Sequence, residues 1–218
     1  MNLYFRLALA WLRSLRTERL TPMMSTNTHF RVLPSDLDIF GHMNNGRFLQ
    51  IMDVARFEWM LRTNVWSVLR REGWLPSLGG NLVHYRRALK PFARYRVQTQ
   101  LLGYEGPWVL LEHRFRDANG RIAAVSCTRA SLRRGRRMLP GHEVFETVDP
   151  RALDLRPPAY VIPWLEADRM LYDRSTSLAE KKEARRVEAL TSGRKPRHHL
   201  RLALEQSSTS TLVRGANS

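Results

Sequence analysis

The sequence predicts an α+β fold in which an antiparallel sheet wraps around one long buried helix. Three observations support this: a helical apolar stripe over residues 45–61, four extended segments after it, and turn residues between those segments. Asn119-Gly120 separates the last two segments, and this pair between alternating runs is a strong hairpin signal. Adjacent strands are therefore expected to be antiparallel, and a helix followed by such strands is an α+β pattern.

The first expected elements are a short extended segment at residues 28–36 and the long helix. Pro34 keeps the extended segment from entering a helix at that point. In the helix the apolar residues recur at intervals of three and four, as on one buried face. They are Phe48, Ile51, Met52, Ala55 and Trp59. A second, shorter helical piece is expected at residues 64–74.

The extended segments are expected at residues 81–90, 93–105, 108–117 and 121–134. Lys90-Pro91, Glu105-Gly106-Pro107 and Asn119-Gly120 separate them. Together with the first extended segment they predict a meander of four or five strands. A single sheet of this kind covers its helix poorly and leaves an edge exposed, so we expect a homodimer or homotetramer.

The first 20 residues are apolar but interrupted by arginines, and no uncharged run approaches the roughly 20 residues that a membrane span requires. As a helix, this segment would place Arg6, Arg13 and Arg16 on one side. Phe5, Leu9 and Leu12 lie away from them, which suits a basic helix in peripheral contact with a membrane. Alternatively the segment docks against the domain, or it lies upstream of the true start at Met23 or Met24.

The C-terminal part changes composition after about residue 165. Residues 166–193 alternate charged residues with Ala and Leu, as a solvated helix would. The last 25 or so residues lose this pattern and are expected to be mostly disordered; there His198-His199 could bind metal or phosphate, or belong to a mobile tail. The chain is thus expected to comprise an N-terminal basic amphipathic segment (1–27), a folded domain (28–165) and a charged helix with a tail (166–218).

Charge and cysteine content narrow the function classes. Lys and Arg number 36 against 20 Asp and Glu, and the net charge of +16 favours phosphate-bearing partners: nucleic acid, anionic lipid or coenzyme A. The single cysteine, Cys127, excludes an internal disulfide and any CxxC zinc site, and agrees with a reducing, cytoplasmic location. The histidines show no HxxxH pair, so no metal is expected.

The stretch "SDLDIFGHMNNGRF", residues 35–48, gathers polar chemistry just ahead of the long helix. One interpretation is structural: Asn44 or Asn45 caps the helix, and Gly41 supplies an unusual backbone angle. The other is catalytic. Asp38 and His42 would sit in a turn beside the unpaired N–H groups and positive dipole of a helix N-terminus, which suit a developing oxyanion.

That arrangement outlines an acyl-transfer site. Asp38 could activate water as a general base, or attack a carbonyl itself to form an anhydride, while N–H groups near Asn45 polarise the carbonyl oxygen. The sequence contains no GxSxG elbow, and Cys127 lies in an apolar strand without an acidic or basic pattern nearby. A carboxylate is therefore a better candidate than a serine or cysteine nucleophile.

The motif "DLDIFGHMNN", followed by an amphipathic helix and a strand series, resembles the hotdog-fold acyl thioesterases, especially the hydroxybenzoyl-CoA thioesterase-like branch. "RVLPSDLDIFGHMNN" is more similar still to the thioesterase superfamily member six group, and so is "RRALKPFARYRVQTQLLGYE". The resemblance covers residues 28–135, about half of the chain. It implies a hotdog fold, hydrolysis of an acyl-CoA or acyl-carrier-protein thioester in fatty acid metabolism, and no cofactor beyond the coenzyme A of the substrate.

The resemblance also assigns roles to residues. Asp38 matches the catalytic carboxylate, and Asn45 matches the helix-start position whose backbone N–H binds the thioester oxygen. His42 matches a histidine in the same loop of plant acyl-carrier-protein thioesterases. Those enzymes also use an asparagine two positions after the Asp, where this chain has Phe40.

The predicted substrate-binding residues fall into three groups. Gly41 and Asn44 belong to the motif. Arg86, Arg87 and Lys90, with Arg94 and Arg96, surround a predicted turn and could meet the phosphates of coenzyme A, or form a solvated strand face. The acyl chain would lie near Phe48, Met52 and Trp59, although residues at such helical spacing are first of all core.

Two alternatives remain open at this point. The same fold could carry an enoyl-CoA hydratase, since hotdog hydratases also use an Asp and a His. Otherwise the chain could be a non-catalytic basic module, in which "HYRRALKPFARYR" binds nucleic acid or anionic membrane. The aromatic spacing there follows strand alternation and no RNA-binding motif is present, so no nucleic acid partner is expected.

Overall fold

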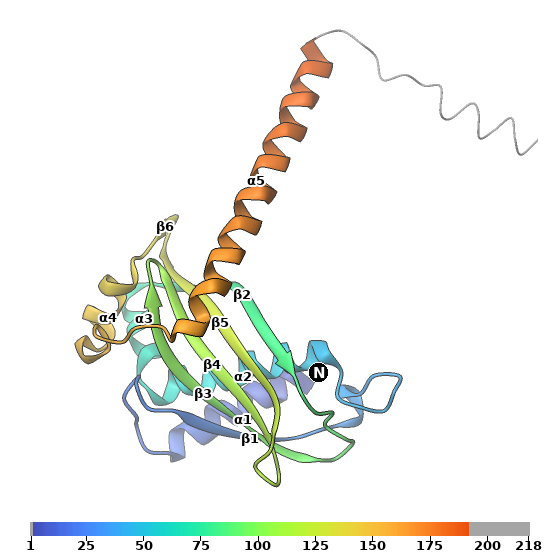
Figure 1. Cartoon of the computed structure of the whole chain (residues 1–218). Helices are drawn as coiled ribbons and strands as arrows, with labels where there is room; N and C mark the ends of the chain where they lie inside the picture. Colours follow the sequence, from blue (N-terminus) through green and yellow to red (C-terminus); the bar gives the residue numbers. More distant parts are fainter. Residues whose placement is uncertain (1, 192–218) are drawn as a thin grey trace, which may run out of the picture. The chain divides into compact units, whose positions relative to one another are not determined.

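The computed structural model describes residues 2–191, and the chain divides into two compact units, Met1–Trp164 and Leu165–Ser218. Helix α5 (Ile162–Thr191) begins four residues before the expected solvated helix and continues through most of it (Figure 1). The predicted disordered tail, with His198-His199, lies outside the described residues.

The first unit contains the expected antiparallel sheet. Its strands are β1 (Thr26–Arg31), β2 (Leu75–Tyr85), β3 (Arg94–Glu105), β4 (Trp108–Asp117) and β5 (Ile122–Arg134), with β6 (Arg137–Met138) paired to β5. The order across the sheet is β1-β3-β4-β5-β2, and every pair is antiparallel. Only β3, β4 and β5 form a meander. The hairpin at Asn119-Gly120 is confirmed: it closes through a bond from the N–H of Gly120 to the carbonyl of Asp117 (2.9 Å).

The long helix is confirmed as α2 (Asn45–Arg62), and the five apolar residues that predicted it are all buried. It packs against β1 and β3 at one face of the sheet (Figure 1). The shorter helix is α3 (Val65–Glu72), and α4 (Gly141–Val148) follows β6. Three short 3-10 turns complete the elements, at Pro34–Asp36, Pro150–Ala152 and Ala159–Val161.

The strand predicted at residues 81–90 is displaced. Strand β2 begins at Leu75 and ends at Tyr85, so residues 86–90 form a loop. Pro76 and the glycines at 79 and 80 weaken the strand pattern, and the register slips between Leu78 and Gly80. Gly79 is required where it stands, because a Cβ there would lie 2.4 Å from the Trp108 ring.

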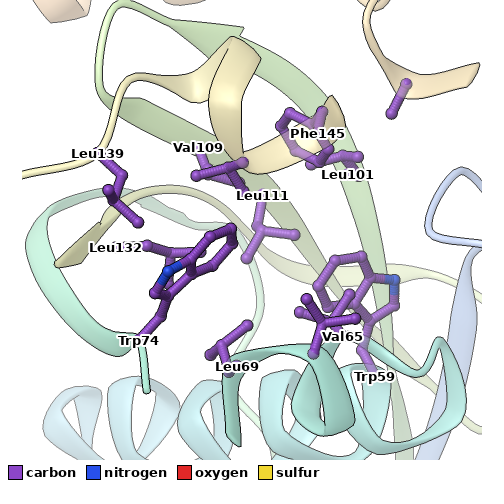
Figure 2. Packing of buried hydrophobic residues seen from close by; sticks show 13 residues of the cluster. Trp59, Val65, Leu69, Trp74, Leu101, Val109, Leu111, Leu132, Leu139 and Phe145 are labelled. Atoms are coloured by element: carbon purple, nitrogen blue, oxygen red, sulfur yellow. The ribbon is translucent and has the colours of Figure 1, made fainter. Parts of the chain in front are cut away.

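A polar pair divides the core between α2 and the sheet. On β3, Thr99 lies between Val97 and Leu101, which belong to two different apolar clusters. His113, the partner of Thr99 on β4, lies 3.1 Å from the Thr99 hydroxyl through Nδ1. One cluster packs against the first half of α2. The other is enclosed by the sheet, by α3 and α4, and by the second half of α2 (Figure 2).

The N-terminal segment forms helix α1 (Asn2–Arg16), which belongs to the first compact unit and packs against α2. Its arginines reach the outer edge of β1. Arg13 Nη1 donates to the carbonyl of His29 (3.0 Å), and Arg6 Nη2 donates to that of Arg31 (3.4 Å). Among the described residues, no helix combines the length and apolarity that crossing a bilayer demands.

Candidate active site

The motif loop is a tight hairpin that ends where α2 begins. Leu37 and Met43 form an antiparallel bridge, and the N–H of Asp38 donates to the carbonyl of His42 (2.8 Å). The turn closes through the N–H of Gly41 and the carbonyl of Asp38 (3.1 Å). Gly41 has φ +74°, which residues with a Cβ rarely adopt, so the predicted unusual backbone angle is confirmed. The hairpin holds Asp38 and His42 opposite one another.

The carboxylate of Asp38 is fixed by the backbone of its own turn. Its Oδ1 accepts hydrogen bonds from the N–H groups of Phe40 (2.9 Å) and His42 (3.2 Å). Among the described residues, no donor reaches Oδ2. Asp38 and His42 are half-buried, while Ile39 and Phe40 at the tip are 92% and 76% exposed. The acid is thus oriented, with one oxygen left to act on water or a ligand.

The start of α2 presents an open backbone amide next to this hairpin. Asn44 is the N-cap: its side chain accepts from the N–H of Gly46 (2.8 Å), and its carbonyl accepts from that of Arg47 (2.9 Å). Within the described part of the chain, the N–H of Asn45 has no acceptor. The carbonyl of Asn45 accepts from the Tyr85 hydroxyl (3.1 Å), which ties the helix start to the end of β2. An N–H at this position suits a developing oxyanion.

The other carboxylate of the motif, Asp36, has a structural role. It is fully buried, and its Oδ2 accepts from Arg6 Nη2 (2.5 Å) and from the N–H of Leu33 (2.9 Å). The guanidinium of Arg47 lies 3.5 Å from Oδ1, and the N–H of Asn44 donates to the Asp36 carbonyl (2.8 Å). Asp36 therefore connects α1, the motif hairpin and the start of α2.

The basic residues predicted to bind phosphate lie in an exposed loop beside the motif. Arg86, Arg87 and Lys90 follow the end of β2 and are exposed. The loop joins the motif hairpin through the N–H of Met43, which donates to the carbonyl of Leu89 (3.0 Å), and both side chains are buried. The structure thus brings this loop and the motif together; its role in phosphate binding stays a prediction.

Phe48 and Met52, predicted near the acyl chain, are only 3% and 0% exposed and belong to the apolar cluster at the first half of α2. A cavity of the first unit with a largely apolar wall lies farther along the helix. It has a volume of about 470 Å³ and reaches α3, α4 and the ends of β2, β4 and β5. Figure 2 shows part of its wall, where side chains of α2 and α3 face those of the sheet and α4. They include Trp59, Val65, Leu69, Val109, Leu111 and Phe145.

An ion pair lines the same cavity. Arg56 Nη1 lies 3.2 Å from Asp53 Oδ1, both on α2. Burial raises the pKa of Asp53 above its ordinary value and lowers that of Arg56, while their mutual attraction opposes both shifts. Elsewhere in the described residues, no group of three or more potential metal ligands gathers.

Comparison with known proteins identifies the family. The model of the thioesterase-like superfamily matches residues 32–158, more than half of the chain. The chain belongs to this superfamily. A curated relative, Protein THEM6 of Drosophila melanogaster, is 29% identical over 69% of this chain and 77% of its own length. Protein THEM6 of Xenopus laevis is 34% identical over 38% of this chain, and the match spans only 41% of that relative.

Solved structures show the same architecture. YbaW, a probable thioesterase of Escherichia coli, superposes with a TM-score of 0.53 at 18% identity, over 58% of this chain and 98% of its own. A 1,4-dihydroxy-2-naphthoyl-CoA thioesterase of Synechocystis gives 0.50 at 15% identity, over 62% of this chain and all of its own. At such identity the likeness concerns the fold alone, and it confirms the predicted hotdog fold.

Proposed function

We propose that this chain is an acyl-CoA thioesterase that hydrolyses its substrate through Asp38 and the start of α2. The observation that carries the proposal is the pairing of an oriented carboxylate, Asp38, with the open amide of Asn45 beyond the same hairpin. Superfamily membership supports thioester hydrolysis as the reaction. Asp36 is not the catalytic acid in this account, because Arg6 and Arg47 neutralise it inside the fold.

The reaction is simplest with Asp38 as a general base. Its Oδ2 takes a proton from water as the water oxygen attacks the thioester carbonyl carbon. The negative charge that develops on the carbonyl oxygen is stabilised by the N–H of Asn45 and the positive end of the α2 dipole. Collapse of this intermediate breaks the C–S bond, and the thiolate takes up a proton to give the free acid and coenzyme A. His42, opposite Asp38, is the proposed donor of that proton.

The same geometry allows Asp38 to attack the carbonyl directly. An acyl-aspartyl anhydride would then form with release of the thiol, and water would hydrolyse it to the same products. A single turnover in water enriched in ¹⁸O separates the two routes. Hydrolysis of the anhydride at the aspartyl carbonyl leaves the heavy oxygen in Asp38, whereas general-base catalysis leaves it in the product acid alone.

The cavity beside α2 suggests an acyl chain of considerable length. Asp53, the first α2 residue of its wall, lies about 12 Å along the helix from Asn45 at 1.5 Å per residue. A thioester carbonyl held at Asn45 would therefore need a long apolar chain to reach it. The volume of about 470 Å³ and the largely apolar wall suit such a chain.

Coenzyme A is the proposed carrier, with the loop of Arg86, Arg87 and Lys90 near its phosphates. The loop is exposed and lies against the motif hairpin through Leu89 and Met43, where phosphates beyond the thioester would emerge. Guanidinium and ammonium groups are suitable phosphate partners. An acyl carrier protein, whose prosthetic arm carries a single phosphate, would depend less on these three residues.

The test is thiol release from acyl-CoA substrates of increasing chain length by the purified full-length protein. We expect turnover to rise with chain length until the cavity is filled. If no substrate released thiol, the hydrolase would be excluded. If enoyl-CoA lost its absorbance without thiol release, the result would also exclude the hydrolase and would favour the hydratase.

A further inference from the structure

Helix α1 exposes a large apolar face. On the side toward the domain it buries Ala10 beside Arg6, which binds Asp36, while Arg13 binds the β1 edge. The opposite side points outward. The large exposed side chains of this face are Tyr4, Phe5, Trp11, Leu12 and Leu15. A soluble surface helix normally exposes polar side chains on its outer side, so this face, called here the α1 apolar face, suits a non-aqueous partner.

A cationic groove lies beside the α1 apolar face, between α1 and β1. Its volume is about 330 Å³, and Phe5 and Leu9 form part of its wall together with Arg6, Arg13, Arg31 and Arg94. None of the described residues that line it is acidic. Asp36 neutralises Arg6 from within the fold, and the carboxylate of Glu58 attracts Arg13, so the charge of the groove is set chiefly by Arg31 and Arg94.

The register of the sheet makes the groove suitable for an anion. Arg31 on β1 is directly opposite Arg94 on β3, and like charges at such a position destabilise a strand pair. In the described part of the chain, neither side chain forms an ion pair. A bound phosphate between them would relieve this repulsion and would accept hydrogen bonds from both guanidinium groups.

We propose that α1 docks the protein on a membrane that contains anionic phospholipid. The α1 apolar face enters the interface, and a lipid phosphate occupies the groove of Arg13, Arg31 and Arg94. Trp11 and Tyr4 suit this position, because amphipathic aromatic rings favour the headgroup level. Charge complementarity selects the partner: residues 2–17 contain three basic side chains, Arg6, Arg13 and Arg16, and no acidic one.

The test is cosedimentation of the full chain with vesicles of phosphatidylcholine alone or of phosphatidylcholine with phosphatidylglycerol. We expect binding to the anionic vesicles that weakens with added salt, and little binding to the neutral ones. Leu15→Asp should weaken binding at least tenfold, because it places a charge in the apolar face. Arg94→Gln should weaken it about fivefold, the effect of one arginine at an anionic surface.

Matched controls lie elsewhere on the chain. Leu171 on α5 is 65% exposed and Leu15 is 64% exposed, so Leu171→Asp makes the same change at an equally exposed leucine. Arg70→Gln removes an exposed arginine from α3. Both controls should bind as wild type does, and so should Asp38→Asn, because docking does not involve the proposed reaction.

Three results would overturn the proposal. The first is absence of binding to anionic vesicles by the wild-type chain, and the second is equal binding by Leu15→Asp. The third is a lower solution mass for Leu15→Asp than for wild type by light scattering, which would show that a second copy covers the α1 apolar face. If instead Arg94→Gln raised the KM for acyl-CoA and left vesicle binding unchanged, the groove would be a coenzyme A site.

Discussion

Two aspartates separated by one residue have different environments in this protein. Asp36 is enclosed by Arg6, Arg47 and the N–H of Leu33, whereas Asp38 accepts only backbone hydrogen bonds from its own turn. The motif in the sequence predicts Asp38 as the catalytic acid, and this role stays a prediction. The sequence could not identify the partner of Asp36, because Arg6 is 30 residues away and its helix carried no sign of which side faces the domain.

The Asp36–Arg6 pair should contribute strongly to stability. Asp36→Asn removes the negative charge that faces the buried guanidinium of Arg6, so we expect a loss of about 3 kcal/mol in the free energy of unfolding. Urea denaturation measures it. The control is Glu143→Gln, which disrupts an exposed pair with Arg137 and should change the midpoint little. Equal midpoints for the two variants would contradict the assigned role.

His113 should make stability depend on pH. Complete burial, with a smaller effect of the nearby Arg56, holds the pKa of its imidazole well below 6.5. As the pH falls below about 6.5, this histidine takes up a proton in the unfolded chain, whereas folded His113 stays neutral. Proton binding favours the unfolded state, so the free energy of unfolding decreases as the pH falls. His113→Gln should show a smaller decrease in the urea midpoint between pH 7.5 and 5.5. An unchanged decrease would assign the effect to other groups.

At the scale of elements, the apolar pattern of α2 was sufficient to predict its limits, because its buried face and its Asn44 cap are both local features. The limits of β2 were not predictable in the same way. Its first half contains Pro76 and two glycines, which do not favour a strand by themselves; pairing with β5 holds it extended. Gly79 is needed there because the Trp108 ring occupies the space that a side chain would fill. The position of the cavity depends equally on distant elements, since α3 and α4 form part of its wall.

The cavity should determine which acyl chains are accepted. Ala130 on β5 lines it, and Ala130→Phe would fill part of its volume without adding charge. We expect turnover of long-chain acyl-CoA to fall at least tenfold while that of short-chain acyl-CoA is preserved. Ala130→Gly, which fills nothing, is the control. A uniform loss across all chain lengths would mean that the cavity does not hold the acyl chain.

At the scale of the whole molecule, the two edges of the sheet differ. Helix α1 covers the edge of β1, where Arg6 and Arg13 bind carbonyl groups. The other edge strand, β2, carries exposed apolar side chains, among them Leu75, Leu78 and Leu82. Among the described residues, no strand pairs with the outer edge of β2, and such an edge is a site for pairing with another chain. We therefore propose that two chains of the homodimer or homotetramer predicted from the sequence pair through β2.

Leu82→Asp tests this assembly. Two charges brought together across an edge-to-edge contact repel, so the variant should have a solution mass near the 25.5 kDa of one chain, whereas wild type should have about twice that mass. Light scattering after size-exclusion chromatography gives both values. Leu171→Asp on α5 is the control for the added charge. A wild-type chain that elutes as a monomer would exclude this dimer.

The central claim is that the Asp38 carboxylate acts on a thioester carbonyl held at the start of α2. The most direct measurement is kcat for thiol release by Asp38→Asn beside wild type, together with the melting temperature of each. The amide oxygen can still accept from the N–H groups of Phe40 and His42, so the fold and its melting temperature should be preserved. We predict that kcat falls about 10²- to 10⁴-fold, the usual contribution of a general base. Wild-type turnover by the folded variant would contradict the account.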